Sequence, residues 1–271
     1  MNFLMQSRGR LRVYLSADHV GVVREHGWIR RRVECAATRV ALDDAAAPSW
    51  APAVRALAEL IASRGWGGLP MEVAVSSEFV HLALVTDIRR HLSAPEMQGL
   101  AQGMFTRVLG ESAPAWDVRY GAADASTVVA AATEKALVAE LESAARACKG
   151  ALRSLTPLWS CAVNGQRARL ARRSAWLVLT ESRAAAFGLL ERGRWRAMRT
   201  RALDAARGIG VAQALERECR YHGSDTRDVI VVGEHQDMGL PAGWKVEHLP
   251  LAPARFGALP VECRPAALAG A

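Results

Sequence analysis

One arrangement of hydrophobic and polar residues occurs twice along this chain. Residues 11–33 consist of an apolar strand, a polar turn, a second apolar strand, a hairpin with an acid and a glycine, and a third strand. Residues 175–200 show the same features in the same order. We align Ser16 with Thr180, the small hydroxyl residue at the end of each first strand. A three-strand unit used twice predicts a duplicated fold.

Helices and further strands are predicted around these two units. The spacing of apolar residues predicts helices at 53–63, 134–148 and 203–221. Another helix begins at Ser93, where a capping hydroxyl, a proline and Glu96 form a start signal, and ends at Gly110. The other strands are expected at 71–75, 79–86, 116–120, 126–132, 151–155, 228–233 and 244–249. Residues 36–52 read as a loop, and the Pro- and Ala-rich end after residue 250 reads as extended or loosely ordered chain.

Strands that alternate with helices indicate an α/β fold. We expect two lobes with mixed sheets, residues 1–165 and residues 166–271, with the polar stretch 166–174 as the hinge between them. The first lobe is expected to contain an inserted small subdomain at about residues 71–132. A chain of 271 residues is long enough for two domains of ordinary size.

The composition indicates a protein that folds in the cytoplasm. Hydrophobic residues make up 51% of the chain, enough for a buried core, yet no apolar run reaches the roughly 18 to 20 residues of a membrane helix. The apolar segment at the N-terminus is too short for a secretory signal and lacks a small-residue cleavage site. The five cysteines are scattered without a CxxC pair, so we expect reduced and mostly buried thiols.

The net charge of +8 is concentrated in one region. Residues 166–207 contain eleven arginines and three acids. Such a region can contact nucleic-acid phosphates, anionic lipid headgroups or an acidic protein segment. Alternatively, arginines at the outward positions of strands simply keep an apolar sheet soluble. The candidate anion-contact residues are Arg167, Arg169, Arg172, Arg173, Arg194, Arg196, Arg199 and Arg201.

Other chemical motifs carry weaker signals. Cys219 and His222 have C-x-x-H spacing, but no second closely spaced pair completes a zinc site, so we expect no metal. The chain contains no GxxxxGK[ST] phosphate loop. Trp28 and Trp195 follow the two hairpin glycines, where they either pack at a sheet edge or, if exposed, form a stacking surface for single-stranded nucleic acid.

Several segments, taken in order, resemble the actin-like ATPase superfamily. They are MEVAVSSEFVHLALV, the helix start SAPEM, the helix at 134–148 leading into GALRSLTPL, the second three-strand unit with ERGRWRAMR, and the late strand and turn VIVVG. Within the superfamily these pieces look like the type IV pilus assembly protein PilM and the cytoplasmic domain of the type II secretion L protein. The resemblance covers most of the chain. It implies an actin-like fold, in which two related ribonuclease H-like lobes close around a nucleotide.

The same resemblance argues against ATP hydrolysis. In active members the first strand ends in an acid followed by glycine and small hydroxyl residues, so that backbone N–H groups approach phosphate and the carboxylate holds metal-bound water. Tyr14 and Ser16 stand at the acid and glycine positions of the first lobe. Val178 and Thr180 are their equivalents in the second lobe. Neither lobe supplies the carboxylate in this alignment.

Four further residues complete the candidate nucleotide site. Asp18 and Glu181 lie close enough that a shifted alignment would make one of them the missing carboxylate. Gly233 ends the late strand, but Glu234 follows where family members often have a second glycine, and its side chain would crowd the site and repel phosphate. The resemblance therefore implies a pseudo-ATPase that needs no cofactor, with binding of ATP and Mg²⁺ as the alternative.

The resemblance also implies a partner. An actin-like scaffold of a pilus or secretion assembly would bind the short cytoplasmic tail of an inner-membrane protein, against the sheet and helices between residues 71 and 110. That partner would recruit the chain to the cytoplasmic face of the inner membrane, where the arginines would meet anionic headgroups. Two alternatives stay open: a functional ATP-binding or sugar-kinase-like enzyme, and a basic nucleic-acid-binding protein, which we favour less. The sequence carries no signal for the oligomeric state.

Overall fold

The computed structural model describes residues 9–27, 32–41, 50–86, 92–124, 127–203, 210–233, 238–251, 256 and 259–270. The chain divides into two compact units. The first comprises Met1–Phe79, Ala136–Gly165 and Leu251–Ala271, and the second comprises Val80–Lys135 and Gln166–Pro250. This division differs from the predicted lobes of residues 1–165 and 166–271. The chain after Pro250 packs with the first unit, and the segment from Val80 to Lys135 packs with the second.

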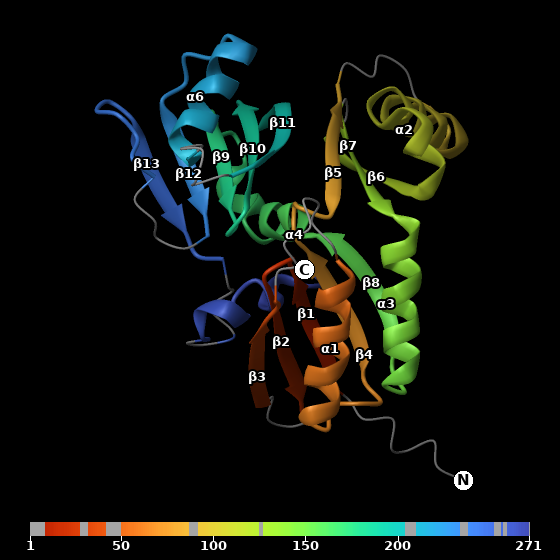
Figure 1. The fold of residues 1–271 in the computed structure, drawn as a ribbon. Coiled ribbons are helices and arrows are strands. Elements are labelled where there is room, and N and C mark those ends of the chain that lie inside the picture. The colour runs from red at the N-terminus through yellow and green to blue at the C-terminus, as the bar shows by residue number, and fades with distance from the viewer. Residues whose placement is uncertain are drawn as a thin grey trace. The chain divides into compact units, whose positions relative to one another are not determined.

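A five-stranded sheet organises the first unit, in the order β3-β2-β1-β4-β8 (Figure 1). Its strands are β1 (Arg10–Leu15), β2 (His19–His26), β3 (Arg32–Arg39), β4 (Pro70–Val75) and β8 (Ala151–Pro157). The first three are antiparallel neighbours, whereas β4 lies parallel to both β1 and β8. The third predicted strand is thereby confirmed, and it continues to Arg39, into residues that the sequence suggested were loop.

Helix α1 (Ala51–Ser63) contacts β2 and β3 on one side of this sheet. It buries Ala53, Val54, Leu57 and Ile61. The same unit contains α3 (Lys135–Ala147) and α4 (Leu158–Gly165), which begins directly after β8. The helices predicted at 53–63 and 134–148 are therefore confirmed within two residues at each end, because both have a clear apolar stripe at helical spacing.

The C-terminal segment covers the other side of the first sheet. Its short 3₁₀ helices, η4 (Val261–Cys263) and η5 (Ala266–Leu268), contact β1, β2, β3 and β4. A side chain at Gly21 of β2 would collide with the carbonyl oxygen of Glu262, so the two backbones touch there. Cys263 and Leu268 are buried. The prediction of a loosely ordered end is wrong for these residues.

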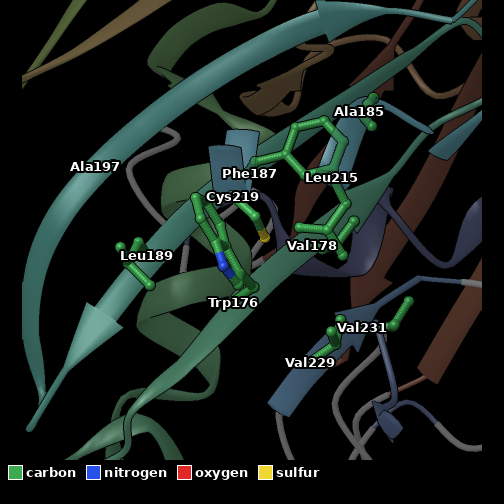
Figure 2. Close-up of a cluster of buried hydrophobic side chains, with 11 residues drawn as sticks. Trp176, Val178, Ala185, Phe187, Leu189, Ala197, Leu215, Cys219, Val229 and Val231 are labelled. Atoms are coloured by element: carbon green, nitrogen blue, oxygen red, sulfur yellow. The ribbon is translucent and has the colours of Figure 1, made fainter. Parts of the chain in front are cut away.

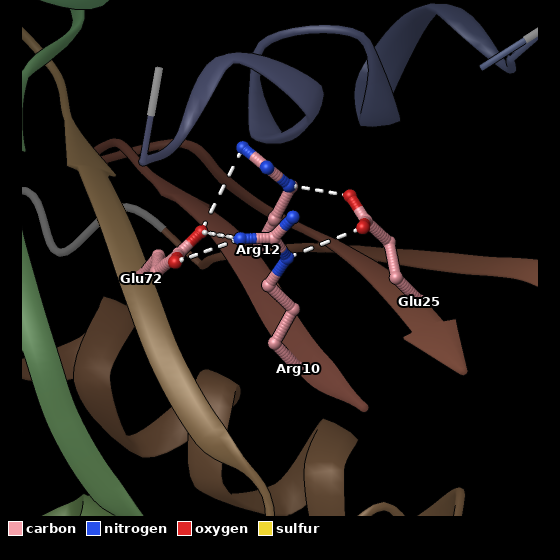
Figure 3. A network of polar contacts seen from close by, with 4 residues as sticks. All are labelled: Arg10, Arg12, Glu25 and Glu72. Atoms are coloured by element: carbon pink, nitrogen blue, oxygen red, sulfur yellow. Dashed lines mark hydrogen bonds and ion pairs between the residues drawn. The ribbon is translucent and has the colours of Figure 1, made fainter. Parts of the chain in front are cut away.

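Four charged side chains lie on this covered side (Figure 3). Arg12 is 1% exposed, and its Nε donates to Oε1 of Glu25 at 2.5 Å. Arg10 contacts both Glu25 and Glu72, with its Nε 3.2 Å from Glu25 Oε2 and its Nη1 3.1 Å from Glu72 Oε1. Phe256 of the C-terminal segment lies 5.5 Å from the Arg12 guanidinium. Burial lowers the pKa of Arg12, while Glu25 counters that effect.

The second unit repeats the first unit's sheet, in the order β11-β10-β9-β12-β13 (Figure 1). Its strands are β9 (Ala175–Thr180), β10 (Ala184–Glu191), β11 (Arg194–Ala202), β12 (Asp228–Val232) and β13 (Lys245–Leu249). Again three antiparallel strands are followed by two parallel ones. The duplication predicted from the hydrophobic pattern is confirmed.

Helix α6 (Val211–His222) packs against the second sheet. Figure 2 shows Trp176, Val178 and Phe187 of the sheet together with Leu215 and Cys219 of the helix. The helix was predicted from residue 203, but among the described residues it begins after its N-cap Gly210, and residues 204–209 lie outside the described chain. The predicted hinge at 166–174 contains the short helix α5 (Arg167–Leu170).

A separate three-stranded sheet lies in the second unit, in the order β5-β7-β6. It consists of β5 (Val80–Val85), β6 (Trp116–Asp124) and β7 (Thr127–Glu134), with α2 (Ala94–Leu109) and η1 (Gly110–Ala115) inserted between β5 and β6. Phe105 and Ala101 of α2 pack on Val118 and Ala130 of the sheet. The inserted subdomain was predicted from residue 71, which is wrong at that end because Met71–Val75 belongs to β4 of the first sheet.

Candidate functional site

The turn between β1 and β2 carries the first lobe's candidate nucleotide residues. Ser16 is buried, and its hydroxyl donates to Oδ1 of Asp18 at 2.6 Å. The His19 amide donates back to Ser16 Oγ at 3.2 Å, and His19 Nδ1 lies 3.2 Å from the same Asp18 oxygen. The Ser16 amide donates to the His19 carbonyl at 3.1 Å, which closes the turn. The Ser16 hydroxyl, the Asp18 carboxylate and His19 Nδ1 of this turn therefore contact one another, whereas His19 Nε2 is buried without a hydrogen-bond partner among the described residues.

The turn between β9 and β10 carries the second lobe's candidates, Thr180 and Glu181. Here the Glu181 amide donates to the Ala184 carbonyl at 2.9 Å. Because the Ser16 amide closes the first turn in the same way, the structure makes Ser16 equivalent to Glu181. The predicted pairing of Ser16 with Thr180 is thus shifted by one residue.

The side-chain alternation agrees with this shift. Residues two positions apart in a strand point to the same side of the sheet. Val178 faces α6, so Thr180 faces that side too. Arg12 faces the C-terminal segment, so Ser16 lies on that side. Ser16 and Thr180, which the sequence alignment pairs, therefore lie on different sides of their sheets, as a shift of one residue requires. The position equivalent to Tyr14 becomes Leu179, so the shifted alignment still places no carboxylate there.

Gly233 comes directly after β12 and lies against the end of β9. Its φ of +145° favours glycine, and a Cβ at this position would lie 2.6 Å from Thr180 Oγ1. The structure therefore brings Gly233 and Thr180 together, as expected of neighbouring parallel strand ends. Glu234 lies outside the described residues.

These two turns are a poor fit for Mg²⁺ and ATP. A phosphate loop presents several backbone N–H groups to the ligand, but the amides of Ser16, His19 and Glu181 already donate within their own turns. The Asp18 carboxylate, which would hold metal-bound water, is bonded by Ser16 and His19 instead.

The predicted anion-contact arginines fall into two groups. Arg167 and Arg169 lie on α5, Arg172 and Arg173 follow it, and Arg194 begins β11. The loop after α5 meets the β10–β11 hairpin, since the Gly193 amide donates to the Arg173 carbonyl at 2.7 Å. Arg196 also lies near the hairpin but pairs with Glu191 at 3.0 Å.

Arg199 and Arg201 form the second group, on the side of the sheet that faces α6. The Arg201 Nε donates to Glu218 Oε1 at 2.7 Å, and Glu218 is 0% exposed. The Arg199 guanidinium lies 5.3 Å from the ring of Tyr221. These two arginines serve the packing of α6 and do not join the hairpin group.

Two features relevant to binding were missed in the sequence. Arg192 lies at the tip of the β10–β11 hairpin and is exposed, and its place between Glu191 and Gly193 in a turn could have revealed it. On α2, Leu100 and Val108 are 39% and 68% exposed, with half-buried Met104 between them at helical spacing. By contrast β4, at the start of the region where a partner was expected, is a central and largely buried strand.

Three other expectations can be placed in the structure. Trp195 is 7% exposed, so it offers no stacking surface, and Trp28 lies outside the described residues. Within the described ranges, no three His, Cys, Asp or Glu side chains converge in a way that could hold a metal ion. None of the helices in the described part of the chain combines the length and the apolar character needed to cross a membrane.

Comparison with known proteins yields structural neighbours only. No protein-family model matches the chain, and no curated protein sequence matches it. The structure of the PilM-PilN type IV pilus biogenesis complex contains a chain with a TM-score of 0.72 at 14% identity, covering 96% of this chain and 97% of that one. The cytoplasmic domain of EpsL, an inner-membrane component of the type II secretion system of Vibrio cholerae, has a TM-score of 0.59 at 10% identity, with 92% of each chain covered.

A third neighbour comes from Bacteroides thetaiotaomicron. This protein of unknown function has an actin-like ATPase fold and gives a TM-score of 0.59 at 10% identity, covering 88% of this chain and 86% of that one. The two sheets of identical strand order, which belong to the two units of one chain, are consistent with these likenesses. The chain therefore has the actin-like ATPase fold, and it resembles PilM and the cytoplasmic domain of EpsL along nearly its whole length.

Proposed function

We propose that this protein is an actin-like scaffold of a type IV pilus or type II secretion-like assembly, and that it binds the cytoplasmic tail of an inner-membrane protein. The observation that carries the proposal is the likeness to PilM over 96% of the chain, in a structure of the PilM-PilN complex. EpsL, an inner-membrane component of a secretion system, supports the same setting. The partner holds the chain at the cytoplasmic face of the membrane.

The scaffold works without turning over ATP in this proposal. Its support is that the amides of Ser16, His19 and Glu181 already donate within their own turns, and that Thr180 packs against Gly233. Calorimetric titration with Mg²⁺ and ATP at near-physiological salt tests this point, and we expect no saturable heat. Saturable micromolar binding that is lost in Asp18→Asn or Glu181→Gln would instead identify a live nucleotide site.

The partner's tail docks on the exposed apolar side of α2, in the second unit. Leu100, Met104 and Val108 follow one another at i, i+4 and i+8, and the outer two are exposed although their side chains are large and apolar. Five large hydrophobic side chains are exposed within the described ranges, and α2 carries two of them. A short amphipathic tail can cover such a stripe with apolar residues at matching spacing.

Cross-linking in cells followed by affinity purification tests the proposal. We expect recovery of an inner-membrane protein, and a synthetic peptide of its cytoplasmic tail should bind the purified chain. The double variant Leu100→Lys and Val108→Lys should weaken peptide binding at least tenfold. Val246→Lys, which changes an equally apolar and 41% exposed residue on β13, should bind as the wild type does. Normal peptide binding by the α2 variant would overturn the docking site, and no inner-membrane partner would overturn the function.

A further inference from the structure

Five exposed arginines of the second unit lie on α5, on the loop after it and on the β10–β11 hairpin, and none of them pairs with an acid among the described residues. We call this group the arginine end, and its members are Arg167, Arg169, Arg172, Arg192 and Arg194. The nearby acids are engaged elsewhere, since Glu247 pairs with Arg173 at 2.8 Å and Glu191 with Arg196 at 3.0 Å. The arginine end therefore presents uncompensated positive charge.

Backbone contacts hold the arginine end in a fixed arrangement. The Arg192 amide donates to Ser174 Oγ at 2.9 Å, and the Gly193 amide donates to the Arg173 carbonyl at 2.7 Å. Gly193 lies so close to the preceding loop that a Cβ there would lie 2.5 Å from the backbone nitrogen of Arg172. The hairpin tip and the loop after α5 thus form one braced surface that carries charges from both segments.

Two of these arginines occupy backbone positions that disfavour them. Arg172 has a φ of +64° and Arg192 a φ of +52°, a region that glycine and asparagine adopt most readily. Glycine or asparagine would form these turns with less backbone strain than arginine. An arginine at both strained positions, side by side, indicates that the side chains themselves have a role.

Three members of the arginine end lie far from the candidate nucleotide residues. Arg172, Arg192 and Arg194 lie where β9 begins, whereas Thr180 and Gly233 lie where β9 and β12 end. Six strand residues at about 3.3 Å each place these two ends roughly 20 Å apart. These three arginines therefore cannot reach a phosphate held at the turn of Thr180.

We propose that the arginine end binds the phosphate headgroups of anionic phospholipids, an inference that deepens the proposed function by giving the membrane-recruited scaffold a direct lipid contact. Exposed guanidinium groups on a braced surface suit an array of headgroups, because each contributes separately. Single-stranded nucleic acid suits it less well, since Phe187 and Trp195, the aromatic residues of the β10–β11 hairpin, are buried and cannot stack on bases.

Sedimentation with lipid vesicles tests this inference. The full chain is mixed with vesicles of phosphatidylcholine alone, or of phosphatidylcholine and phosphatidylglycerol in equal parts. We expect binding only to the mixed vesicles, and we expect it to fall as salt is raised. The test variant replaces four arginines while respecting the left-handed turn, as Arg167→Gln, Arg169→Gln, Arg192→Asn and Arg194→Gln. An effect of about fivefold per arginine predicts a loss of at least about a hundredfold in the partition coefficient.

A matched variant separates a local surface from net charge. It removes four other exposed arginines of the second unit, as Arg119→Gln, Arg183→Gln, Arg217→Gln and Arg220→Gln. We expect it to bind the mixed vesicles within about threefold of the wild type. Equal losses in both variants, or no binding of the wild-type chain to mixed vesicles, would overturn the proposal.

Two further measurements distinguish other anionic partners. Fluorescence polarisation with labelled single-stranded and duplex DNA should show binding weaker than that to mixed vesicles at the same salt, whereas tight DNA binding lost in the test variant would replace lipid by nucleic acid. The tail peptide of the membrane partner should bind the test variant normally. If the test variant no longer binds the peptide, the arginine end is a binding surface for the membrane partner and not for lipid. The vesicles contain no protein, so their result is independent of whether the scaffold function holds.

Discussion

At the scale of single residues, Arg12 places a charge inside the first unit. Its guanidinium lies between the carboxylates of Glu25 and Glu72, beneath the C-terminal segment. Arg12→Met removes one cation and leaves both acids in a poorly hydrated place. Because Arg10 still contacts both acids, we expect a loss of about 3 kcal/mol in the free energy of unfolding, at the lower end for a broken buried pair.

Urea unfolding followed by tryptophan fluorescence measures this loss. Arg119→Met is the matched control, because Arg119 pairs with Asp117 at the surface and is 81% exposed, so its loss should change stability by less than about 0.5 kcal/mol. A change below about 1 kcal/mol in Arg12→Met would show that the buried network is energetically neutral.

His222 makes the second unit's stability depend on pH. Burial lowers its pKa, Glu218 opposes that shift, and Arg199 and Arg201 add to it. The unfolded chain therefore takes up a proton at this residue near pH 6.5, where the folded chain still holds it neutral. The neutral His222 therefore contributes to the free energy of unfolding above about pH 6.5. This contribution is lost as the pH falls toward the lowered pKa of His222 in the folded state.

Replacing His222 by glutamine tests this sign. Unfolding free energies measured between about pH 5 and pH 7.5 should rise with pH in the wild type, and the rise should be smaller in His222→Gln. A steeper rise in the variant would mean that the folded state raises the pKa of His222.

The residue scale also shows where sequence reasoning about the candidate site stopped. Gly233 was named because the resemblance places a glycine after the late strand, and the structure brings this residue against Thr180. The pairing of Ser16 with Thr180 rested on their shared hydroxyl groups. The true register is set by turn hydrogen bonds, and these make Ser16 equivalent to Glu181. Side-chain similarity does not report that register, so an error of one position was to be expected.

At the scale of elements, α2 contains two glycines that weaken it. Nothing lies within 4 Å of a Cβ added at Gly99 or Gly103, and neither has a positive φ. Alanine at either position should therefore stabilise the helix by up to about 1 kcal/mol, the difference in helix propensity. Hydrogen exchange of the α2 amides should slow in the double variant Gly99→Ala and Gly103→Ala.

The same substitution elsewhere provides a control of opposite sign. A Cβ at Gly150, just before β8, would collide with the backbone carbonyl of Leu69. Gly150→Ala should lower the free energy of unfolding by about 1 to 3 kcal/mol. Faster hydrogen exchange of the α2 amides in the variant Gly99→Ala and Gly103→Ala would contradict the prediction that both positions accept a side chain.

The local hydrophobic pattern predicted the positions of helices and strands far better than it predicted which strands pair. The helix at 134–148 and the strand at 228–233 were recognised because their apolar spacing is strong and uninterrupted. The consecutive strands β4 and β5 look alike in sequence but enter different sheets, since pairing depends on residues distant in the chain. The segment after residue 250 lacks periodicity, and its buried alanines are recognisable only from the sheet side they cover.

At the scale of the whole molecule, the duplication leaves one side of the first sheet to be covered from elsewhere in the chain. Each five-stranded sheet is followed or interrupted by helices that cover one side, and in the first unit the C-terminal segment covers Arg12 and Gly21. The first unit is therefore complete only when the last residues of the chain have folded onto it.

Two variants test this dependence. Removing the residues after Pro250 should expose the β1–β4 side of the first sheet, so that its amides exchange hydrogen much faster and the chain binds a hydrophobic dye. Gly21→Val keeps the segment but places a side chain against the Glu262 carbonyl, which should cost about 1 to 3 kcal/mol. In both variants the amides of β9 and β10 serve as the internal control, because their sheet belongs to the other unit. If β1 and β2 stay as protected as β9 and β10 in the shortened chain, the C-terminal segment is only a surface covering, and the first unit folds without it.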